Sequence, residues 1–212
     1  MAEFELINIT EYDNSDTFIE AVYAIFQLRF RNSDRRITFK NKQIFIDYTE
    51  LYQDKSITFW HIASFEGNDN YDKYTQYPCE NTFNKGTCEH KCKIVDGNCF
   101  YIKNTPRIAC LYRASYINFV YDIIKLSNDG NSNIQIINTE RTVRKKKTKR
   151  LVLRYKDKNY DYAIIFEPKY NESKSDILRY KLITAYPIFS KDDIEELDRM
   201  WKDQQFKKES RR

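Results

Sequence analysis

The sequence predicts an α+β protein: N-terminal helices packed on a mainly antiparallel sheet, followed by a C-terminal helix. Two observations predict this class. Apolar residues recur at helical spacing in the first part of the chain, and beyond about residue 134 the pattern changes to successive short strands. The 212 residues are 41% hydrophobic and 32% charged, which is typical of a globular protein able to bury a core without disulfides. We expect a single domain over residues 1–212, with a loop-rich insertion at 66–105.

The first half of the chain contains two predicted helices separated by strands. Residues 15–31 carry apolar side chains at helical spacing, and Ser15 or Asp16 is a plausible N-cap for this helix. A second helix is expected over 106–126, where apolar residues recur every three or four positions. Between them lie three strand-like runs, at 37–39, 43–48 and 57–62.

The second half reads as a meander of antiparallel strands. A polar turn at 127–133 ends the second helix, and Lys158-Asn159 suits a tight turn between two strands. Pro187 is expected to end the last strand, and residues 192–207 form an amphipathic helix. The strands themselves are expected at 134–138, 150–156, 160–167 and 178–185.

The N-terminus carries acidic residues where a signal peptide would carry basic ones, and no stretch approaches 18 apolar residues. We therefore expect a cytoplasmic protein with no membrane partner. In that compartment thiols stay reduced, so clustered cysteines are better explained as metal ligands than as disulfides.

Four of the five cysteines lie close together in the insertion, with His90 between them. Zinc takes four such ligands tetrahedrally and can replace a core in a segment with few apolar residues. The favoured ligands are four thiolates, with His90 replacing one of them as the alternative. Because four thiolates leave no open position for water, the zinc would be structural. The favoured thiolates belong to Cys79, Cys88, Cys92 and Cys99.

The stretch from Cys79 to Cys92 resembles the first part of a CCCH-type RNA-binding zinc finger, although Asp96 stands where that finger has its closing histidine. Three interpretations stay open at this point: a structural zinc staple, a zinc module that touches RNA, or thiols without metal.

A basic segment at 141–154 holds eight Lys and Arg residues and no acid. Such density indicates a polyanion partner, here RNA, although a solvated hairpin rim is the simpler alternative. The expected RNA-binding residues are Arg141, Arg144, Lys145, Lys146, Lys147 and Lys149.

The chain has two histidines, and if His90 belongs to the zinc loop, His61 is the remaining imidazole able to exchange protons near neutral pH. An ordered set of motifs accompanies it: FWHIAS at 59–64, RASYI at 113–117, KRLVL at 149–153, Glu167, and YKLITAYPI at 180–188. This series resembles a phage- and defence-associated branch of the barnase/EndoU/colicin/RelE-like ribonuclease superfamily, from about residue 17 to 201. That family tends to have Trp at the position of Tyr116 and a shorter connection at 66–105.

The resemblance implies metal-independent RNA cleavage on a face of an antiparallel sheet. Attack by a ribose 2′-OH needs a base, an acid and cations for the phosphorane. His61 is then the general base or acid, and Arg113 is a phosphate clamp. Arg150, or less surely Lys149, stabilises the transition state, and the Thr184 and Tyr186 hydroxyls orient the phosphate.

Each of these residues also has a structural explanation. Arg113 can be a helix-surface ion pair, Thr184 a buried strand hydroxyl and Tyr186 a core residue. Glu167 can supply a carboxylate base or only end a strand.

Three functions follow. The first is an endoribonuclease of toxin or phage-defence type, with tRNA among its possible targets and an inhibitor or regulatory protein as a further partner. The second is a non-catalytic RNA-binding or sensor module with a structural zinc loop. The third is a protein–protein adaptor, which would need a contiguous apolar patch.

Overall fold

The computed structural model describes residues 4–31, 37–66, 99–143 and 145–210. The fold is α+β, as expected, with mostly antiparallel sheets and a C-terminal helix. The chain forms two compact units, and the expectation of one domain stays a prediction. The first unit comprises 1–37 and 46–122, and the second comprises 38–45 and 123–212.

The first unit begins with a short 3-10 helix, η1 (Ile9–Glu11), and the helix α1 (Ser15–Phe30). Asn14 caps α1, one residue before the predicted cap: its side chain accepts hydrogen bonds from the Asp16 and Thr17 backbone amides, and the Thr17 hydroxyl accepts one from the Asn14 amide. This reciprocal capping box fixes the start of the helix. The buried face of α1 includes Phe18 and Phe26, which confirms the predicted helix.

The strand predicted at 57–62 is wrong, because these residues form the helix α2 (Ile57–Ala63). Ser56 begins it by accepting a hydrogen bond from the Phe59 amide at 3.2 Å. Most of α2 is buried, so its aromatic and β-branched residues show no helical periodicity in the sequence. Two short strands, β3 (Leu51–Tyr52) and β4 (Lys55–Ser56), form a hairpin just before it.

The single helix predicted at 106–126 is wrong in its first part and is confirmed as helix, in two pieces, in the rest. Its first part is the strand β7 (Thr105–Ala109), and the rest divides into α5 (Leu111–Ser115) and α6 (Ile117–Asn128). The Cys110 thiol caps α5 by accepting from the Arg113 amide. A short strand that buries Arg107 and Ile108, followed directly by buried helices, reproduces the spacing of one amphipathic helix.

β7 is the central strand of a three-stranded sheet, between β5 (Ser64–Glu66) and β6 (Phe100–Ile102). Arg107 of β7 pairs with Glu66 on one side and with Phe100 on the other. The segment 67–98 therefore leaves and rejoins this sheet at the same level. The insertion expected at 66–105 stays a prediction, and the residues at its two ends belong to strands and not to a loop.

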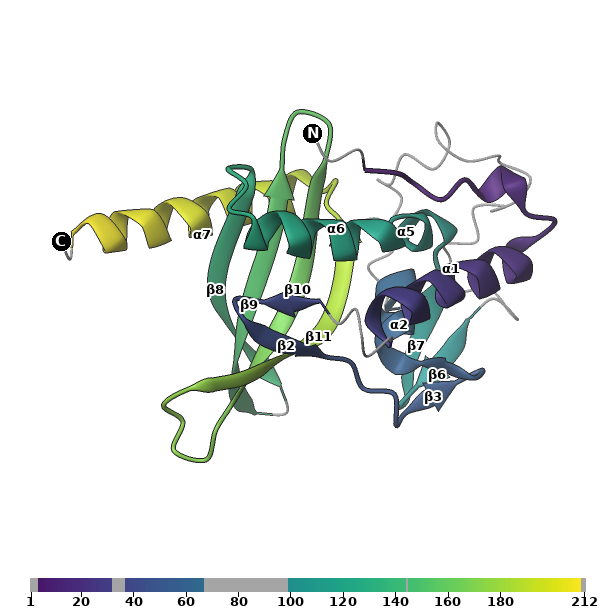
Figure 1. Cartoon of the computed structure of the whole chain (residues 1–212), viewed down its shortest axis with the longest axis horizontal. Coiled ribbons are helices and arrows are strands. Elements are labelled where there is room, and N and C mark those ends of the chain that lie inside the picture. Colours follow the sequence, from purple (N-terminus) through teal and green to yellow (C-terminus); the bar gives the residue numbers. More distant parts are fainter. Residues whose placement is uncertain (1–3, 32–36, 67–98, 144, 211–212) are drawn as a thin grey trace. The chain divides into compact units, whose positions relative to one another are not determined.

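The second unit contains a six-stranded sheet of order β1-β2-β11-β10-β9-β8 (Figure 1). All neighbours are antiparallel except β2 and β11, which are parallel. The predicted meander is confirmed, with longer strands than expected. The turn at Lys158-Asn159 and the end of the last strand at Pro187 are confirmed as well. The strands are β1 (Thr38–Phe39), β2 (Lys42–Phe45), β8 (Ile134–Val143), β9 (Lys146–Lys156), β10 (Asp161–Tyr170) and β11 (Ile177–Pro187).

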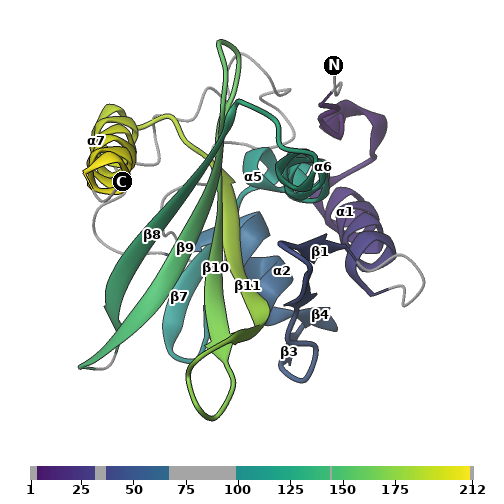
Figure 2. The ribbon, with the colours of Figure 1, turned by 60° about the vertical axis from the view of Figure 1, so that its left-hand side comes forward.

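The helix α7 (Lys191–Glu209) lies against one face of this sheet, which we call the α7 face (Figure 2). Its apolar stripe packs on a buried cluster of sheet residues. None of the described helices is long and apolar enough to cross a membrane. The stripe consists of Ile194, Leu197, Met200 and Trp201, and the cluster of Ile137, Val152, Ala163 and Ile188.

Candidate functional site

The predicted catalytic residues are divided between the two units. His61 and Arg113 belong to the first unit, whereas Arg150, Thr184 and Tyr186 belong to the second. Each group is described within its own unit.

Arg113 is buried, with 6% of its surface exposed, and lies in α5. Its Nη2 donates a hydrogen bond to the backbone carbonyl of His61 at 2.9 Å. This bond joins α5 to the last turn of α2, where His61 is half-buried. The guanidinium thus satisfies a carbonyl at the end of a helix, where backbone acceptors lack intrahelical partners.

Thr184 and Tyr186 do lie on one face of β11, as predicted from their spacing. Tyr186 pairs with Ala163 across the ladder, and Thr184 pairs with Ile165. Ala163 belongs to the buried cluster under α7 and Ile165 packs against that cluster, so this is the α7 face. Tyr186 itself packs against the buried cluster under α7, which supports its core interpretation.

Arg150 projects from β9 onto the same α7 face, because it alternates with Val152 and Arg154. Its side chain is 12% exposed, and its Nη2 lies 3.5 Å from Oε2 of Glu167. The Nε and Nη1 atoms are buried and have no hydrogen-bond partner among the described residues. Burial lowers the pKa of the Arg150 guanidinium; the charge of Glu167 raises it and that of Arg141 lowers it.

Arg154, further along β9, provides the contrast. Its guanidinium is fully buried and bonded to Asp161, to Asp198 of α7 at 2.7 Å, and to Gln135 at 3.2 Å. Burial lowers the Arg154 pKa, but the hydrogen bonds and charges of the two aspartates outweigh it, so the net pKa is raised. A buried charge normally has such partners, and in the described part of the chain Arg150 has one ion-pair partner.

That single partner, Glu167, is shared. Its carboxylate contacts Lys169 on the same strand as well as Arg150. Glu167 is 19% exposed and lies on the α7 face, since it alternates with Ala163 and Ile165. One carboxylate therefore serves two cations.

Further cations continue this surface across β11. Lys181 pairs with Glu167 and Arg179 pairs with Lys169, so both lie on the α7 face. The Arg179 guanidinium stacks over the ring of Phe45 in β2 at 4.3 Å, and the Lys181 ammonium lies 5.9 Å from the same ring. We call five residues the basic face: Arg141, Arg150, Lys169, Arg179 and Lys181.

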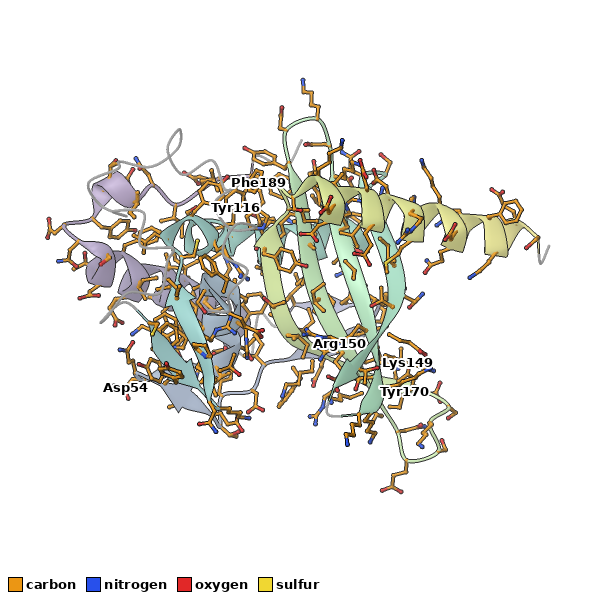
Figure 3. The ribbon with its side chains drawn as sticks, turned by 180° about the vertical axis from the view of Figure 1, so that it is seen from behind. Asp54, Tyr116, Lys149, Arg150, Tyr170 and Phe189 are labelled. Carbon is orange, nitrogen blue, oxygen red and sulfur yellow. The ribbon has the colours of Figure 1, made fainter. Side chains whose placement is uncertain are left out.

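The predicted basic segment is split between the two faces of the sheet. Arg141 pairs with Thr148, which places it on the α7 face, whereas Lys149 pairs with Glu140 on the opposite face. There the Lys149 ammonium lies 5.4 Å from the centre of the Tyr170 ring. Figure 3 labels Lys149, Arg150 and Tyr170 near the end of the strands away from α7.

The remaining lysines of the segment, Lys145, Lys146 and Lys147, are exposed at the β8–β9 hairpin, and Arg144 lies outside the described residues.

The predicted zinc ligands Cys79, Cys88, Cys92 and the alternative His90 also lie outside the described residues. Cys99 is described: it is half-buried, has a free thiol and directly precedes β6. Within the described ranges no three His, Cys, Asp or Glu side chains gather as a metal site.

No protein-family model, curated protein or solved structure matches this chain.

Sequence reasoning missed four members of this site: Lys169, Arg179, Lys181 and Phe45. A usable signal was present, because Arg179 and Lys181 alternate along a predicted strand and must share one face.

Proposed function

We propose that the basic face of the second unit binds the phosphate backbone of RNA. The observation that carries this proposal is Arg150, a largely buried guanidinium with two nitrogen atoms that lack a hydrogen-bond partner. A guanidinium presents a planar fork of donors that matches two oxygens of a phosphate group. A phosphate that takes the place of Glu167 at Nη2 could also accept from one of these two nitrogens.

The surroundings of Arg150 favour a polyanion over a single small anion. Five cations lie on adjacent strands of this part of the sheet, together with the acid Glu167. The spacing of neighbouring strands, about 4.8 Å, lets successive cations follow successive phosphates of an extended strand. Phe45 under Arg179 adds a cation–aromatic stack of the kind on which unpaired bases rest. The choice of RNA over DNA rests on the ribonuclease resemblance.

The adaptor hypothesis receives less support. The large apolar side chains that are exposed within the described residues each lie on a different element and do not suggest one extended patch. They are Leu28, Leu51, Tyr101, Leu178 and Phe206.

Fluorescence anisotropy with an unstructured labelled RNA tests the proposal. Arg150→Gln and Arg179→Gln should each weaken binding severalfold, because each removes a phosphate contact. The matched control is Lys158→Gln, which makes the same charge change in the exposed β9–β10 turn at the other end of these strands. Equal affinity of all four proteins would refute the basic face as the RNA-binding surface. A DNA oligonucleotide of the same sequence, run in parallel, tests the preference for RNA.

The second candidate function is RNA cleavage by 2′-OH transesterification at the same surface. Arg150 and Thr184 share the α7 face, which favours a phosphate-holding role for both. The predicted acid–base residue, His61, belongs to the first unit, so its role is tested by substitution alone. Total RNA incubated with the protein in EDTA should be cut by the wild type and spared by His61→Ala. RNA that is bound but left intact by the wild type would leave only the binding function.

We further propose that the insertion holds one structural zinc ion in a cytoplasmic protein. The support is the group of cysteines in the sequence and the position of Cys99, which directly precedes β6. Native mass spectrometry should find one zinc per chain, lost or weakened in Cys88→Ser. A metal-free wild-type protein purified without chelator would contradict this.

A further inference from the structure

Glu167 occupies the place where an external anion would be expected. Its carboxylate contacts both Arg150 and Lys169. At 3.5 Å, however, the Arg150–Glu167 pair is longer than the 2.7 Å bond from Arg154 to Asp198. It also leaves Nε and Nη1 of Arg150 without a partner. The Glu167 carboxylate therefore neutralises part of the positive charge of the site but leaves hydrogen-bond donors of Arg150 without acceptors.

A phosphate group satisfies such a site better than this carboxylate does. Its oxygens can accept from two guanidinium nitrogens at once, whereas the Glu167 carboxylate is shared with Lys169. Two anions on one guanidinium repel each other strongly where water is largely excluded. Binding of the phosphate would therefore require Glu167 to leave Arg150, and Lys169 on the same strand is available to retain it.

We propose that Glu167 is an internal competitor for the Arg150 phosphate site, displaced onto Lys169 when a phosphate group binds. This inference rests on the proposed RNA-binding function and adds to it how the same site is regulated. Glu167 lowers the affinity of the site for every phosphate-bearing ligand and holds the Arg150 charge partly compensated until a polyanion arrives.

Titration calorimetry with inorganic phosphate, and anisotropy with the labelled RNA, test this competition in the full-length protein. Glu167→Gln should bind phosphate about tenfold more tightly than wild type, since the competing charge is gone while the side-chain shape is kept. The control is Glu172→Gln, which makes the same net charge change at an exposed position in the β10–β11 connection. It should bind phosphate like the wild type. Arg150→Gln should lose the phosphate site.

A second variant separates local competition from net charge. Glu167→Asp keeps the charge but shortens the side chain, which draws the carboxylate back from Arg150. It should also tighten phosphate binding. Circular dichroism and urea unfolding check that each variant folds, and Glu167→Asp carries the test if Glu167→Gln does not fold.

The outcomes separate this inference from the proposed function. Tighter phosphate binding by Glu167→Gln with no RNA binding by any protein supports the competition and removes RNA as the ligand. RNA binding that depends on Arg179, together with unchanged phosphate affinity in both Glu167 variants, overturns the competition and leaves the RNA-binding function standing. A gain in Glu172→Gln equal to that in Glu167→Gln also overturns it, because the effect would then be one of net charge.

Discussion

Arg150 and Arg154 project from the same face of β9, four positions apart, but only Arg154 has partners on every side of its guanidinium. Arg154 joins β9 to Asp161 of β10 and to Asp198 of α7, so it belongs to the structure of the second unit. Arg150 has one distant, shared carboxylate. We therefore assign the stabilising role to Arg154 and the binding role to Arg150, and we expect their variants to behave differently.

Arg154→Met should destabilise the protein by about 3–5 kcal/mol, because it leaves Asp161 and Asp198 without their buried counter-charge. Arg150→Met should cost less than about 1 kcal/mol, since it removes a poorly paired buried charge. Urea unfolding at neutral pH measures both. Similar losses in the two variants would contradict the separation of roles.

Acid should destabilise the second unit through Asp198. Burial raises the Asp198 pKa, but hydrogen bonds from Lys156 and Arg154 outweigh it, so the net pKa is lowered. The folded carboxylate thus holds its proton less readily than the unfolded one. Its contribution is fully present above the unfolded pKa of about 4 and is lost as the pH falls through the lower folded value. Asp198→Asn should therefore flatten the acid side of a stability–pH curve. A stability–pH curve of unchanged shape in Asp198→Asn would contradict this contribution of the Asp198 carboxylate.

Gln204 closes part of the open edge of the sheet. Its Nε2 donates to the Ile136 carbonyl at 2.7 Å, and its Oε1 accepts from the Asn138 amide at 2.9 Å. Gln204→Ala should cost about 1 kcal/mol and speed hydrogen exchange at the Asn138 amide. Lys202→Ala, at an exposed position on α7, is the control. Unchanged exchange at Asn138 would show that α7 does not protect this edge.

In the described part of the chain, three two-residue hairpin turns have positive φ at both of their residues, none of which is glycine. In the β3–β4 turn, Gln53 has φ 47° and Asp54 has φ 57°. Because side chains disfavour this left-handed region, Asp54→Gly should stabilise the protein by about 0.5–1 kcal/mol. Asp54→Ala should destabilise it, as alanine tolerates this region less well than aspartate. The difference in thermal unfolding midpoint between Asp54→Gly and Asp54→Ala measures the effect. Equal midpoints would show that the left-handed backbone at residue 54 is not strained. The other two turns are at Lys40-Asn41 and Lys103-Asn104.

The sequence predicted the elements whose periodicity is long and one-sided. In α1 and α7 the apolar residues recur at helical spacing, and the strands from β8 to β11 are long runs bounded by turn residues, so the sequence identifies them. The predictions failed where burial is nearly complete, as in α2 and the β7–α5 region, because residues buried on all sides carry no period. The hairpins were missed because Lys-Asn and Gln-Asp replace the Asn-Gly pair that normally indicates such a turn.

The site was predictable only in part, for a related reason. The basic segment is visible as a run of charges, but strand alternation sends Arg150 and Lys149 to opposite faces. Lys169 and Arg179 lie far from that segment in sequence and join Arg150 only through strand pairing. A charge run read along the chain therefore identified one strand of a surface that extends across several.

The salt dependence of RNA affinity tests the basic face most directly. Each phosphate contact with a single strand contributes a slope of about −0.7 to a plot of log affinity against log salt. The double variant Arg179→Gln/Lys181→Gln should therefore bind more weakly and lose about 1.4 of the wild-type slope, while Lys158→Gln keeps it. A double variant that retains both the affinity and the slope of the wild type would contradict the account.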